Sequence, residues 1–442
     1  RREMRQFEGA WSSNNSIEAG KVRLERLGYF KEVNVETLPV VGTEDQIDIV
    51  YSVEEETTGS VGGNLGYSDF GLMLGFNLQE QNFLGSGNTV GIGINKNIYS
   101  ESYNISFVDP YATEDGVSLG YNIYFRETDY GEFNVANYLT NSNGLGAQFG
   151  YPISDITRLG FSLTYDKTDI DIGTLPAREI YDFVAAEGNL FETLSAQASW
   201  QRVTLNRGLF PTSGSSTVLS LSATIPGSDL NYYRANIRQR YYRPLSNNFV
   251  FGFQGELGYL NAYGDTEETP FFQNFYAGGP RSLRGFESNT LGPRSTDAPC
   301  YEFNYEEETC PNLIDTDGDG VLDSPYINPY ANTTSRYRDR PIGGNIKIEG
   351  SLQLIFKLPI IEDQRSIRSA FFLDFGNVFS DNCRDYQINC YKPSVDDLRY
   401  SYGVGVTWIT GFGPLSLAIA KPSNAGPQER TEEFQFTVGN VF

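Results

Sequence analysis

The stretch NIKIEGSLQLIFKL, residues 345–358, sets the period from which the fold is predicted. Along most of it, odd-numbered positions carry polar or charged residues, while even-numbered positions carry isoleucine, leucine, phenylalanine and one glycine. A period of two is typical of a β-strand with one wet face and one apolar face. A strand of a soluble β-sandwich would show the same pattern with its apolar face in the core, so this stretch alone leaves both all-β folds open.

The lengths of the connections distinguish a barrel from a sandwich. From residue 57 onward the period recurs in about sixteen segments, which we expect to be strands: 58–67, 70–80, 88–98, 100–109, 115–127, 142–152, 156–168, 192–203, 214–226, 231–244, 248–260, 345–359, 366–380, 398–412, 413–421 and 432–442. Tight turns alternate with long loops at 128–141, 169–191, 261–344, 381–397 and 422–431. Long loops at one end and tight turns at the other are typical of outer-membrane barrels, whereas a sandwich has no reason to separate them. We therefore predict a mainly β fold, in which residues 57–442 form an antiparallel transmembrane β-barrel with a long external loop at 261–344.

Composition agrees with a barrel and excludes other classes. The 46 glycines, 30 phenylalanines and 29 tyrosines suit short aromatic strands. No apolar run approaches the roughly 18 to 20 residues of a membrane-spanning helix, but barrel strands escape that test because only alternate residues face lipid. A formal charge of -23 argues against nucleic acid as a partner. Histidine is absent, which removes the commonest general base and disfavours an outer-membrane enzyme.

Residues 1–56 read as a separate small α/β module. We expect a strand at REMRQFEGAW (2–11), then a helix capped by Asn15, with Glu18 in capping-box position and Gly28 as its stop. Two alternating strands follow, at 33–40 and 46–55. Because Arg1 begins inside this pattern, we expect the chain to lack upstream sequence.

A basic, glycine-rich segment lies within the long loop. GGPRSLRGF (278–286), continuing as ESNTLGPR, resembles the loop-six signature of the BamA family of outer-membrane assembly proteins. The matching positions are Gly278, Gly279, Leu283, Arg284, Gly285 and Phe286. The segments RREMRQFEGAW (1–11) and RLERLGYF (23–30) resemble the last POTRA domain of that family, which implies that residues 1–56 lie in the periplasm and end a longer series of such domains.

The resemblance implies that the loop folds into the barrel lumen, where its arginine pairs with an acid of the wall. Arg284 matches this arginine, and Asp374 matches the acid in an F-x-D-x-G segment. The period of two also places Asp374 on the polar face. The family's second acid is replaced here by Gln353, so we expect Glu349, four residues earlier on that face, to substitute. A solvated surface arginine is the alternative.

The function implied by the resemblance is that of the core subunit that folds and inserts β-barrel proteins into the Gram-negative outer membrane. A weak seam between the first and last strands would lend its edges to an incoming strand. The seam residues we expect are Gly62, Gly63, Phe434, Phe436, Gly439 and Phe442. The final segment FQFTVGNVF (434–442) also resembles the terminal β-signal of bacterial outer-membrane barrels, although an ordinary edge strand is possible.

The partners implied are unfolded β-barrel clients, outer-membrane lipid and accessory lipoproteins such as BamD, with no catalytic residue. The alternative function is a POTRA-barrel polypeptide secretion transporter, of the two-partner secretion or TamA type, which would share the module, the barrel and the arginine motif.

The cysteines and one acidic loop suggest structural cross-links. Cys300 with Cys310, and Cys383 with Cys390, form two close pairs in polar sequence, which suits local disulfides in an oxidising compartment, with a metal site as the alternative. No cofactor is required. The carboxylates of the segment 315–323 have a spacing that could wrap around calcium, although a solvated acidic turn would look the same. They are Asp315, Asp317, Asp319 and Asp323.

Overall fold

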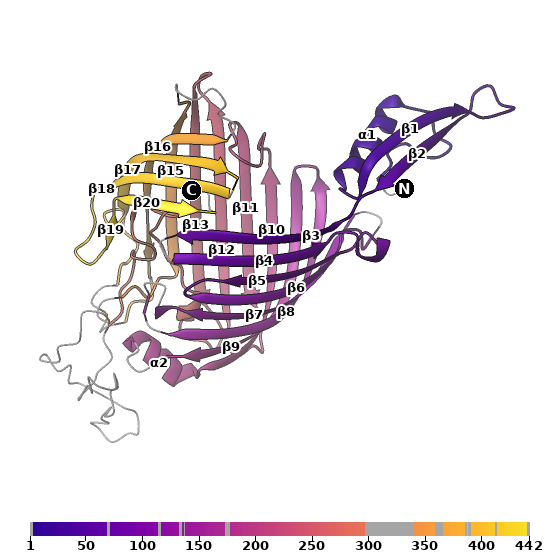
Figure 1. The fold of residues 1–442 in the computed structure, drawn as a ribbon. Coiled ribbons are helices and arrows are strands. Elements are labelled where there is room, and N and C mark those ends of the chain that lie inside the picture. Colours follow the sequence, from indigo (N-terminus) through magenta and orange to yellow (C-terminus); the bar gives the residue numbers. More distant parts are fainter. Residues whose placement is uncertain are drawn as a thin grey trace, which may run out of the picture.

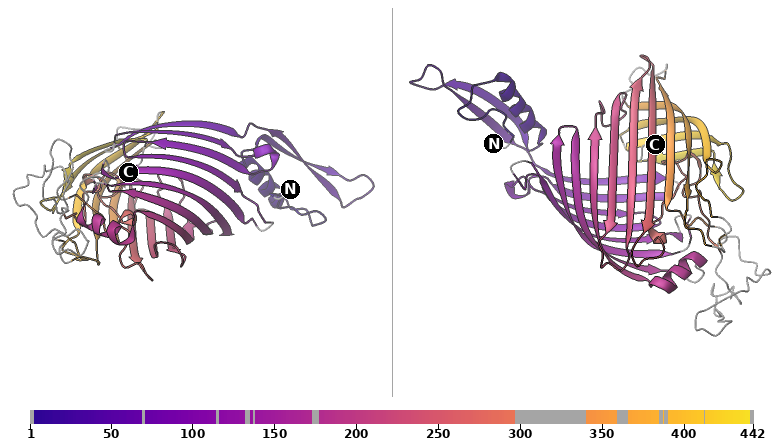
Figure 2. Two further views of the ribbon diagram at one scale, coloured as in Figure 1. Left: turned by 90° about the horizontal axis from the view of Figure 1, so that it is seen from below. Right: turned by 180° about the vertical axis from the view of Figure 1, so that it is seen from behind.

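The molecule consists of a barrel with a small module at one end (Figure 1). The computed structural model describes residues 3–68, 71–113, 116–131, 135–136, 138–172, 177–296, 340–358, 366–384, 387, 390–411 and 413–439. We call the end of the barrel that carries the module the near end and the opposite end the far end (Figure 2).

The module contains α1 (Asn14–Arg26), β1 (Phe30–Pro39) and β2 (Ile47–Glu55), and the two strands pair antiparallel. Gly28 has a φ of 69°, so it ends the helix in the left-handed conformation as predicted. The strand expected at 2–11 is wrong, because residues 3–11 form turns and irregular backbone. Phe7 and Trp11 are 73% and 97% exposed, so this stretch buries no apolar face that would stabilise a strand.

The start of α1 also differs from the prediction. Ser13 is the N-cap, with extended backbone and no side-chain capping bond, so Asn15 lies inside the first turn of the helix. The backbone N–H of Ser13 instead donates to Oε1 of Gln6, 3.0 Å away. A contact with the irregular segment before the helix therefore fixes its start.

Sixteen strands close the barrel, each antiparallel to its neighbours. Every predicted strand segment overlaps one of them, which confirms the predicted fold class. They are β3 (Gly59–Ser68), β4 (Gly71–Glu80), β5 (Thr89–Lys96), β6 (Ser100–Asp109), β7 (Ser118–Asp129), β8 (Leu139–Ser154), β9 (Thr157–Asp171), β10 (Leu190–Val203), β11 (Gly214–Thr224), β12 (Tyr232–Pro244), β13 (Phe249–Ala262), β15 (Ile346–Phe356), β16 (Ile367–Phe379), β17 (Arg399–Thr410), β18 (Gly413–Pro422) and β20 (Phe434–Val438).

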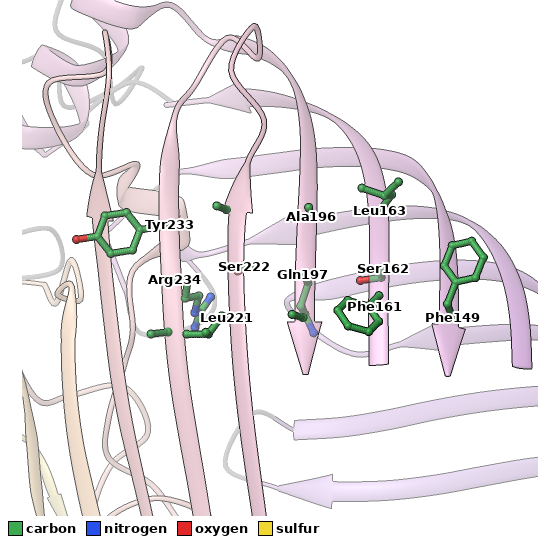
Figure 3. A pocket seen from close by; sticks show the side chains of 13 residues that line it. Phe149, Phe161, Ser162, Leu163, Ala196, Gln197, Leu221, Ser222, Tyr233 and Arg234 are labelled. Carbon is green, nitrogen blue, oxygen red and sulfur yellow. The ribbon is translucent and has the colours of Figure 1, made fainter. Parts of the chain in front are cut away.

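The two faces of the strands settle the choice between barrel and sandwich. Leu352 and Phe371 point outward and are 37% and 53% exposed, whereas Asp374 and Ser401 on inward positions are fully buried. A soluble sandwich would bury the apolar face instead. The outer face of β8–β12 also has a shallow apolar hollow of about 490 Å³, whose lining includes Phe149, Leu163 and Ala196 (Figure 3).

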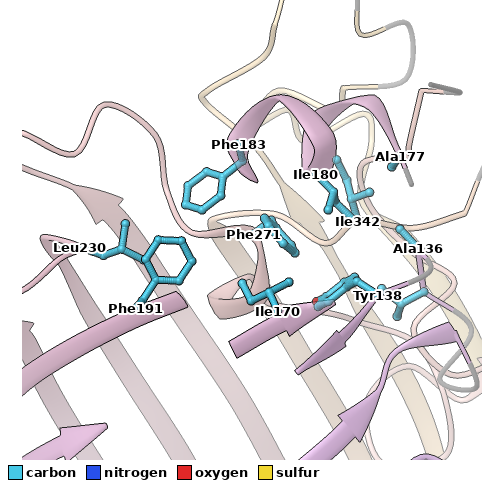
Figure 4. Close-up of a cluster of buried hydrophobic side chains, with 11 residues drawn as sticks. Ala136, Tyr138, Ile170, Ala177, Ile180, Phe183, Phe191, Leu230, Phe271 and Ile342 are labelled. Atoms are coloured by element: carbon cyan, nitrogen blue, oxygen red, sulfur yellow. The ribbon is translucent and has the colours of Figure 1, made fainter. Parts of the chain in front are cut away.

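A buried cluster caps the far end. The connection from β9 to β10, predicted as a loop, contains helix α2 (Arg178–Glu187). Its Ile180 and Phe183 point toward Phe271 and Phe191 (Figure 4). The loop prediction missed this ten-residue helix because its apolar stripe is only two turns long. Short 3₁₀ turns lie at η1 (Phe83–Gly85) and η3 (Phe271–Gln273).

One of the two predicted disulfides is present. Cys383 and Cys390 are bonded in the connection between β16 and β17. Cys300 and Cys310 lie outside the described residues. None of the described helices is long and apolar enough to cross a membrane.

Neighbouring residues on opposite faces of β6 should respond differently to the same charge. Ile105 points outward, is 53% exposed, and pairs with Ile92 and Ile123 on the adjacent strands, whereas Asn104 points inward. Ile105→Arg should destabilise the barrel in phospholipid vesicles by about 2–4 kcal/mol, because it places a cation in hydrocarbon near mid-strand. Asn104→Arg should change the unfolding free energy by less than about 0.5 kcal/mol. Equal effects in urea unfolding would contradict the assignment of the two faces.

Candidate functional site

The loop between β13 and β15 enters the barrel and packs against its wall. Leu283, Phe286 and Leu291 are fully buried in one cluster with Leu260 of β13 and Val378 of β16. An extended loop of this length would normally stay on the surface, because its backbone polar groups need partners. Here the wall of the lumen supplies those partners.

Two glycines of the loop allow this close approach. Gly279 and Gly285 have φ values of 99° and 90°, which side-chain-bearing residues rarely adopt. A Cβ atom at Gly285 would also lie 3.1 Å from the Cβ atom of Ala420 on β18. Gly285 therefore serves the contact between the loop and the wall, whereas a Cβ atom at Gly279 would meet Ser288 of the same loop.

Arg284 forms a two-pronged ion pair with Asp374 of β16. Its Nε lies 2.7 Å from Oδ2 and its Nη2 lies 2.7 Å from Oδ1. The backbone N–H of Arg284 also donates to Oδ2, at 3.2 Å. Nη2 donates further to Oγ of Ser351, at 3.1 Å, and the guanidinium lies 3.4 Å from the ring centre of Phe372. Both charged side chains are buried, so they neutralise each other away from bulk water.

Glu349 and Gln353 do not bind Arg284, which corrects the expectation that Glu349 supplies a second acid. Glu349 pairs with Lys347 at 3.0 Å and accepts a hydrogen bond from the hydroxyl of Ser282. Gln353 donates to Oγ of Ser351, at 3.3 Å. The carboxylate of Asp374 already occupies one edge of the guanidinium, and Ser351 takes a remaining N–H. Glu349 therefore anchors the loop through Ser282 instead.

The loop is also tied to the last strands of the barrel. The backbone N–H of Gly285 donates to Oε1 of Gln435 at 3.2 Å, and Nε2 of Gln435 donates to the carbonyl of Phe286 at 2.8 Å. The two-residue strand β14 (Gly285–Phe286) pairs with β19 (Thr431–Glu432). Sequence reasoning missed Gln435, although it occupies the polar position between two outward phenylalanines of β20. Together, Arg284, Asp374, Ser351 and Gln435 form what we call the latch.

A second buried ion pair holds the connection before β19. Nε of Arg399, the first residue of β17, lies 2.7 and 2.8 Å from the two carboxylate oxygens of Glu429. Both side chains are largely buried. This pair was not predicted, because Glu429 lies in an acidic loop where a solvated carboxylate is the ordinary expectation.

The joint between β20 and β3 is the weak point of the barrel, and we call it the seam. Val438 opposite Tyr67 is its one residue pair among the described residues, whereas β3 pairs with β4 along its whole length. Gly62 and Gly63 lie in the part of β3 that has β4 as its partner on one side only.

The other predicted seam residues lie at the end of the chain. Phe434 and Phe436 point outward and are 59% and 37% exposed. Gly439, directly after β20, has a φ of 81°, and residues 440–442 of the predicted strand 432–442 lie outside the described residues. Phe442 lies outside the described residues, as do the candidate calcium ligands Asp315, Asp317, Asp319 and Asp323.

The barrel, the N-terminal module and the inserted loop define a POTRA-barrel protein. The family model for the Omp85 superfamily domain matches residues 82–442, and the POTRA model, described as a surface antigen variable number repeat, matches residues 1–56. The chain belongs to the Omp85 superfamily and, within it, to the BamA family.

Individual relatives agree with this assignment. The outer membrane protein assembly factor BamA of Neisseria meningitidis serogroup B is 30% identical over all of this chain and 54% of its own length, so the chain spans about half of that relative. The human sorting and assembly machinery component 50 homolog is 23% identical, over 95% of this chain and 81% of its own.

Two solved structures are similar. BamA from Haemophilus ducreyi lacking POTRA domains 1–3 matches 99% of this chain and 80% of its own, at 30% identity and a TM-score of 0.80. CdiB from Escherichia coli matches 99% of this chain and 72% of its own, at 12% identity and a TM-score of 0.58, which shows a shared fold alone.

Breaking one side of the latch should cost more than breaking an exposed ion pair of the same type. Arg284→Ala or Asp374→Asn leaves a buried charge unpaired, so each should lower the unfolding free energy by about 3–5 kcal/mol. The control is Arg430→Ala, which removes an exposed pair with Glu287 at 3.2 Å and should cost at most about 1 kcal/mol. Urea unfolding in vesicles measures all three, and similar losses for Arg284→Ala and Arg430→Ala would contradict the burial of the latch.

Proposed function

We propose that this chain is the core subunit of an outer-membrane machinery that folds and inserts β-barrel proteins, with residues 1–56 in the periplasm. The observation that carries the proposal is the seam, where Val438 opposite Tyr67 is the one pair among the described residues, whereas the other joints pair over several residues. The names of the relatives, assembly factor and assembly machinery component, support it.

The seam has the chemistry that an incoming strand needs. Each unpaired backbone group costs several kcal/mol in hydrocarbon, so an unfolded segment cannot enter the bilayer alone. Within the described part of the chain, the edge of β3 from Gly59 to Gly66 has no register partner in β20, so we infer that it can pair with an incoming strand by β-augmentation. No covalent bond is made or broken in this process.

The latch suits this mechanism because it holds the interior while the edge changes partners. It connects β15 and β16 to β20 through loop contacts that do not use the seam's own hydrogen bonds. The interior of the wall can therefore stay fixed while the one pair between β3 and β20 opens.

The position of residues 1–56 supports a role in docking accessory lipoproteins such as BamD. Glu3 pairs with Arg23 at 2.8 Å and accepts the hydroxyl of Tyr111, which lies in the near-end turn between β6 and β7. Burial of the ring and this hydrogen bond raise the pKa of Tyr111. Tyr29 also donates to the carbonyl of Gly87, at 3.2 Å. These contacts hold the module against the barrel, so a partner bound there would act on the near end.

The alternative, polypeptide secretion, has weaker support. CdiB from Escherichia coli shares the fold at 12% identity, whereas one assembly factor reaches 30% over the whole chain. The fold alone does not separate the two functions, so the assay must distinguish insertion from transport.

Reconstitution in liposomes tests the proposed function directly. An unfolded β-barrel client should fold faster into liposomes that contain this chain than into empty ones, because the β3 edge lowers the cost of inserting unpaired strands. Folding is followed by resistance of the client to added protease. Equal rates, or delivery of the client into the liposome interior, would contradict assembly.

Cross-linking the seam should stop insertion. Tyr67→Cys with Val438→Cys joins the one register pair of β20 and β3, and its oxidation should abolish the acceleration of client folding, which reduction should restore. The matched control, Leu65→Cys with Leu74→Cys, joins a register pair of β3 and β4 and should leave the rate unchanged. Full activity of the oxidised seam variant would show that the seam does not open.

A further inference from the structure

A cavity of about 390 Å³ lies on the lumen side of the wall, between β11–β15 and the tip of the inserted loop. Register pairing places Arg238 opposite Glu256, which in turn is opposite Glu349. Arg240 lies opposite Gln254, which is opposite Ser351 of the latch. Arg281 and Ser282 of the loop close the cavity from above the wall. The cavity therefore adjoins the latch without sharing its ion pair.

The carboxylates at this cavity are already neutralised. Glu256 lies 3.1 Å from Nε of Arg238 and 3.6 Å from Nζ of Lys347, and it accepts from Nδ2 of Asn236 at 2.6 Å. Glu349 is held by Lys347 and by Ser282. These two acids hence have no capacity left for further cations.

Two guanidinium groups remain without a carboxylate. Arg240 and Arg281 are exposed to the cavity, and no acid among the described residues pairs with either. The charged groups around the cavity are Arg238, Arg240, Arg281, Lys347, Glu256 and Glu349. Four positive charges against two negative ones leave an excess of two positive charges, in a chain whose formal charge is -23. The lumen thus has a local excess of positively charged side chains at this cavity.

The geometry of the cations fits an extended peptide. Arg238 and Arg240 are two residues apart on one face of β12, a spacing of roughly 7 Å, and the side chain of Arg238 is still 66% exposed although its Nε pairs with Glu256. Carboxylates at alternate positions of an extended segment have the same spacing, and guanidinium groups bind carboxylates in a two-pronged way. β12 ends at Pro244 on the near end, so Arg240 lies roughly 13 Å from the mouth of the barrel. An unfolded segment can reach it from there.

We propose that the cavity lined by Arg238, Arg240 and Arg281 binds extended, carboxylate-rich polypeptide segments. A role of this cavity in binding unfolded clients rests on the proposed function, whereas the binding of acidic peptides does not. A client of the barrel class presents such segments, because lumen-facing positions of its strands are polar. In this chain the same kind of position carries Glu256, Glu349 and Asp374.

The test uses the full chain in micelles of a neutral detergent at low ionic strength. A fluorescent peptide of alternating Asp and Thr should bind, as measured by anisotropy, and a peptide of alternating Asn and Thr should not. The double variant Arg240→Gln, Arg281→Gln should weaken binding about tenfold, because two partly exposed ion pairs are lost. Arg240→Lys with Arg281→Lys keeps the charge and should restore most of it.

Arg207→Gln is the matched control, because Arg207 is exposed in a near-end turn outside the cavity and its loss should leave binding unchanged. Equal binding of the two peptides, or undiminished binding to the double variant, would overturn the proposal. So would binding of a soluble short-chain phosphatidylglycerol that depends on Arg240 and Arg281 while the Asp peptide does not bind.

Client folding in liposomes separates this proposal from the proposed function. If the chain binds the Asp peptide but fails to accelerate client folding, the assembly function falls and the binding site stands. Acceleration without any peptide binding would remove the site and leave the assembly function intact.

Discussion

A backbone in hydrocarbon must satisfy its own hydrogen bonds, and the described strands of the barrel do so least completely at one joint. Fifteen joints pair neighbouring strands over several residues, whereas Val438 opposite Tyr67 is the one pair between β20 and β3 among the residues that the structure describes. The edge of β3 at this joint is therefore the least extensively paired part of the described wall. A substrate strand that supplies the missing hydrogen bonds would lower the free energy of that edge.

The latch holds the inserted loop beside this weak joint. A buried ion pair is a poor source of stability, since the cost of desolvating both charges offsets much of their attraction. What the pair between Arg284 and Asp374 does supply is a defined position for the loop, because misplacing either partner leaves a buried charge. Through Gln435 the same loop contacts β20, so the strand with the weakest partner is also held from inside the lumen.

Much of the fold could be predicted because lipid and water impose a period of two on each strand. The apolar positions of 345–358 face outward as that period requires, and the sixteen predicted segments all overlap strands. A period of two does not predict the structure of segments whose side chains are not divided between lipid and water. The strand predicted at 2–11 is absent, and the short helix α2 was hidden in a loop, because each depends on tertiary packing.

The site was predictable only in part, for a related reason. The resemblance named Arg284 and Asp374, and the period of two placed Asp374 in the lumen. Which polar side chain accepts the remaining N–H of Arg284 depends on the register between strands, and no sequence pattern reveals that register. Ser351 lies opposite Asp374 in the register of β15 and β16, so it takes the remaining N–H, while Glu349 is two residues away and opposite Gly376. The register of β15 and β16 therefore determines that the second partner of Arg284 is a hydroxyl and not a second carboxylate.

The weakness of the seam comes from backbone geometry and not from unfavourable side chains. Gly439 has a φ of 81°, and a Cβ atom there would lie 3.1 Å from the Cα atom of Gly66 on β3. Glycine at both positions lets the two strands approach while β20 ends. A seam weakened by charged side chains would place polar groups in hydrocarbon, at a cost to the whole barrel. Phe434 and Phe436 instead point outward, so the apolar belt continues across a joint whose one pair in the described part of the chain is Val438 with Tyr67.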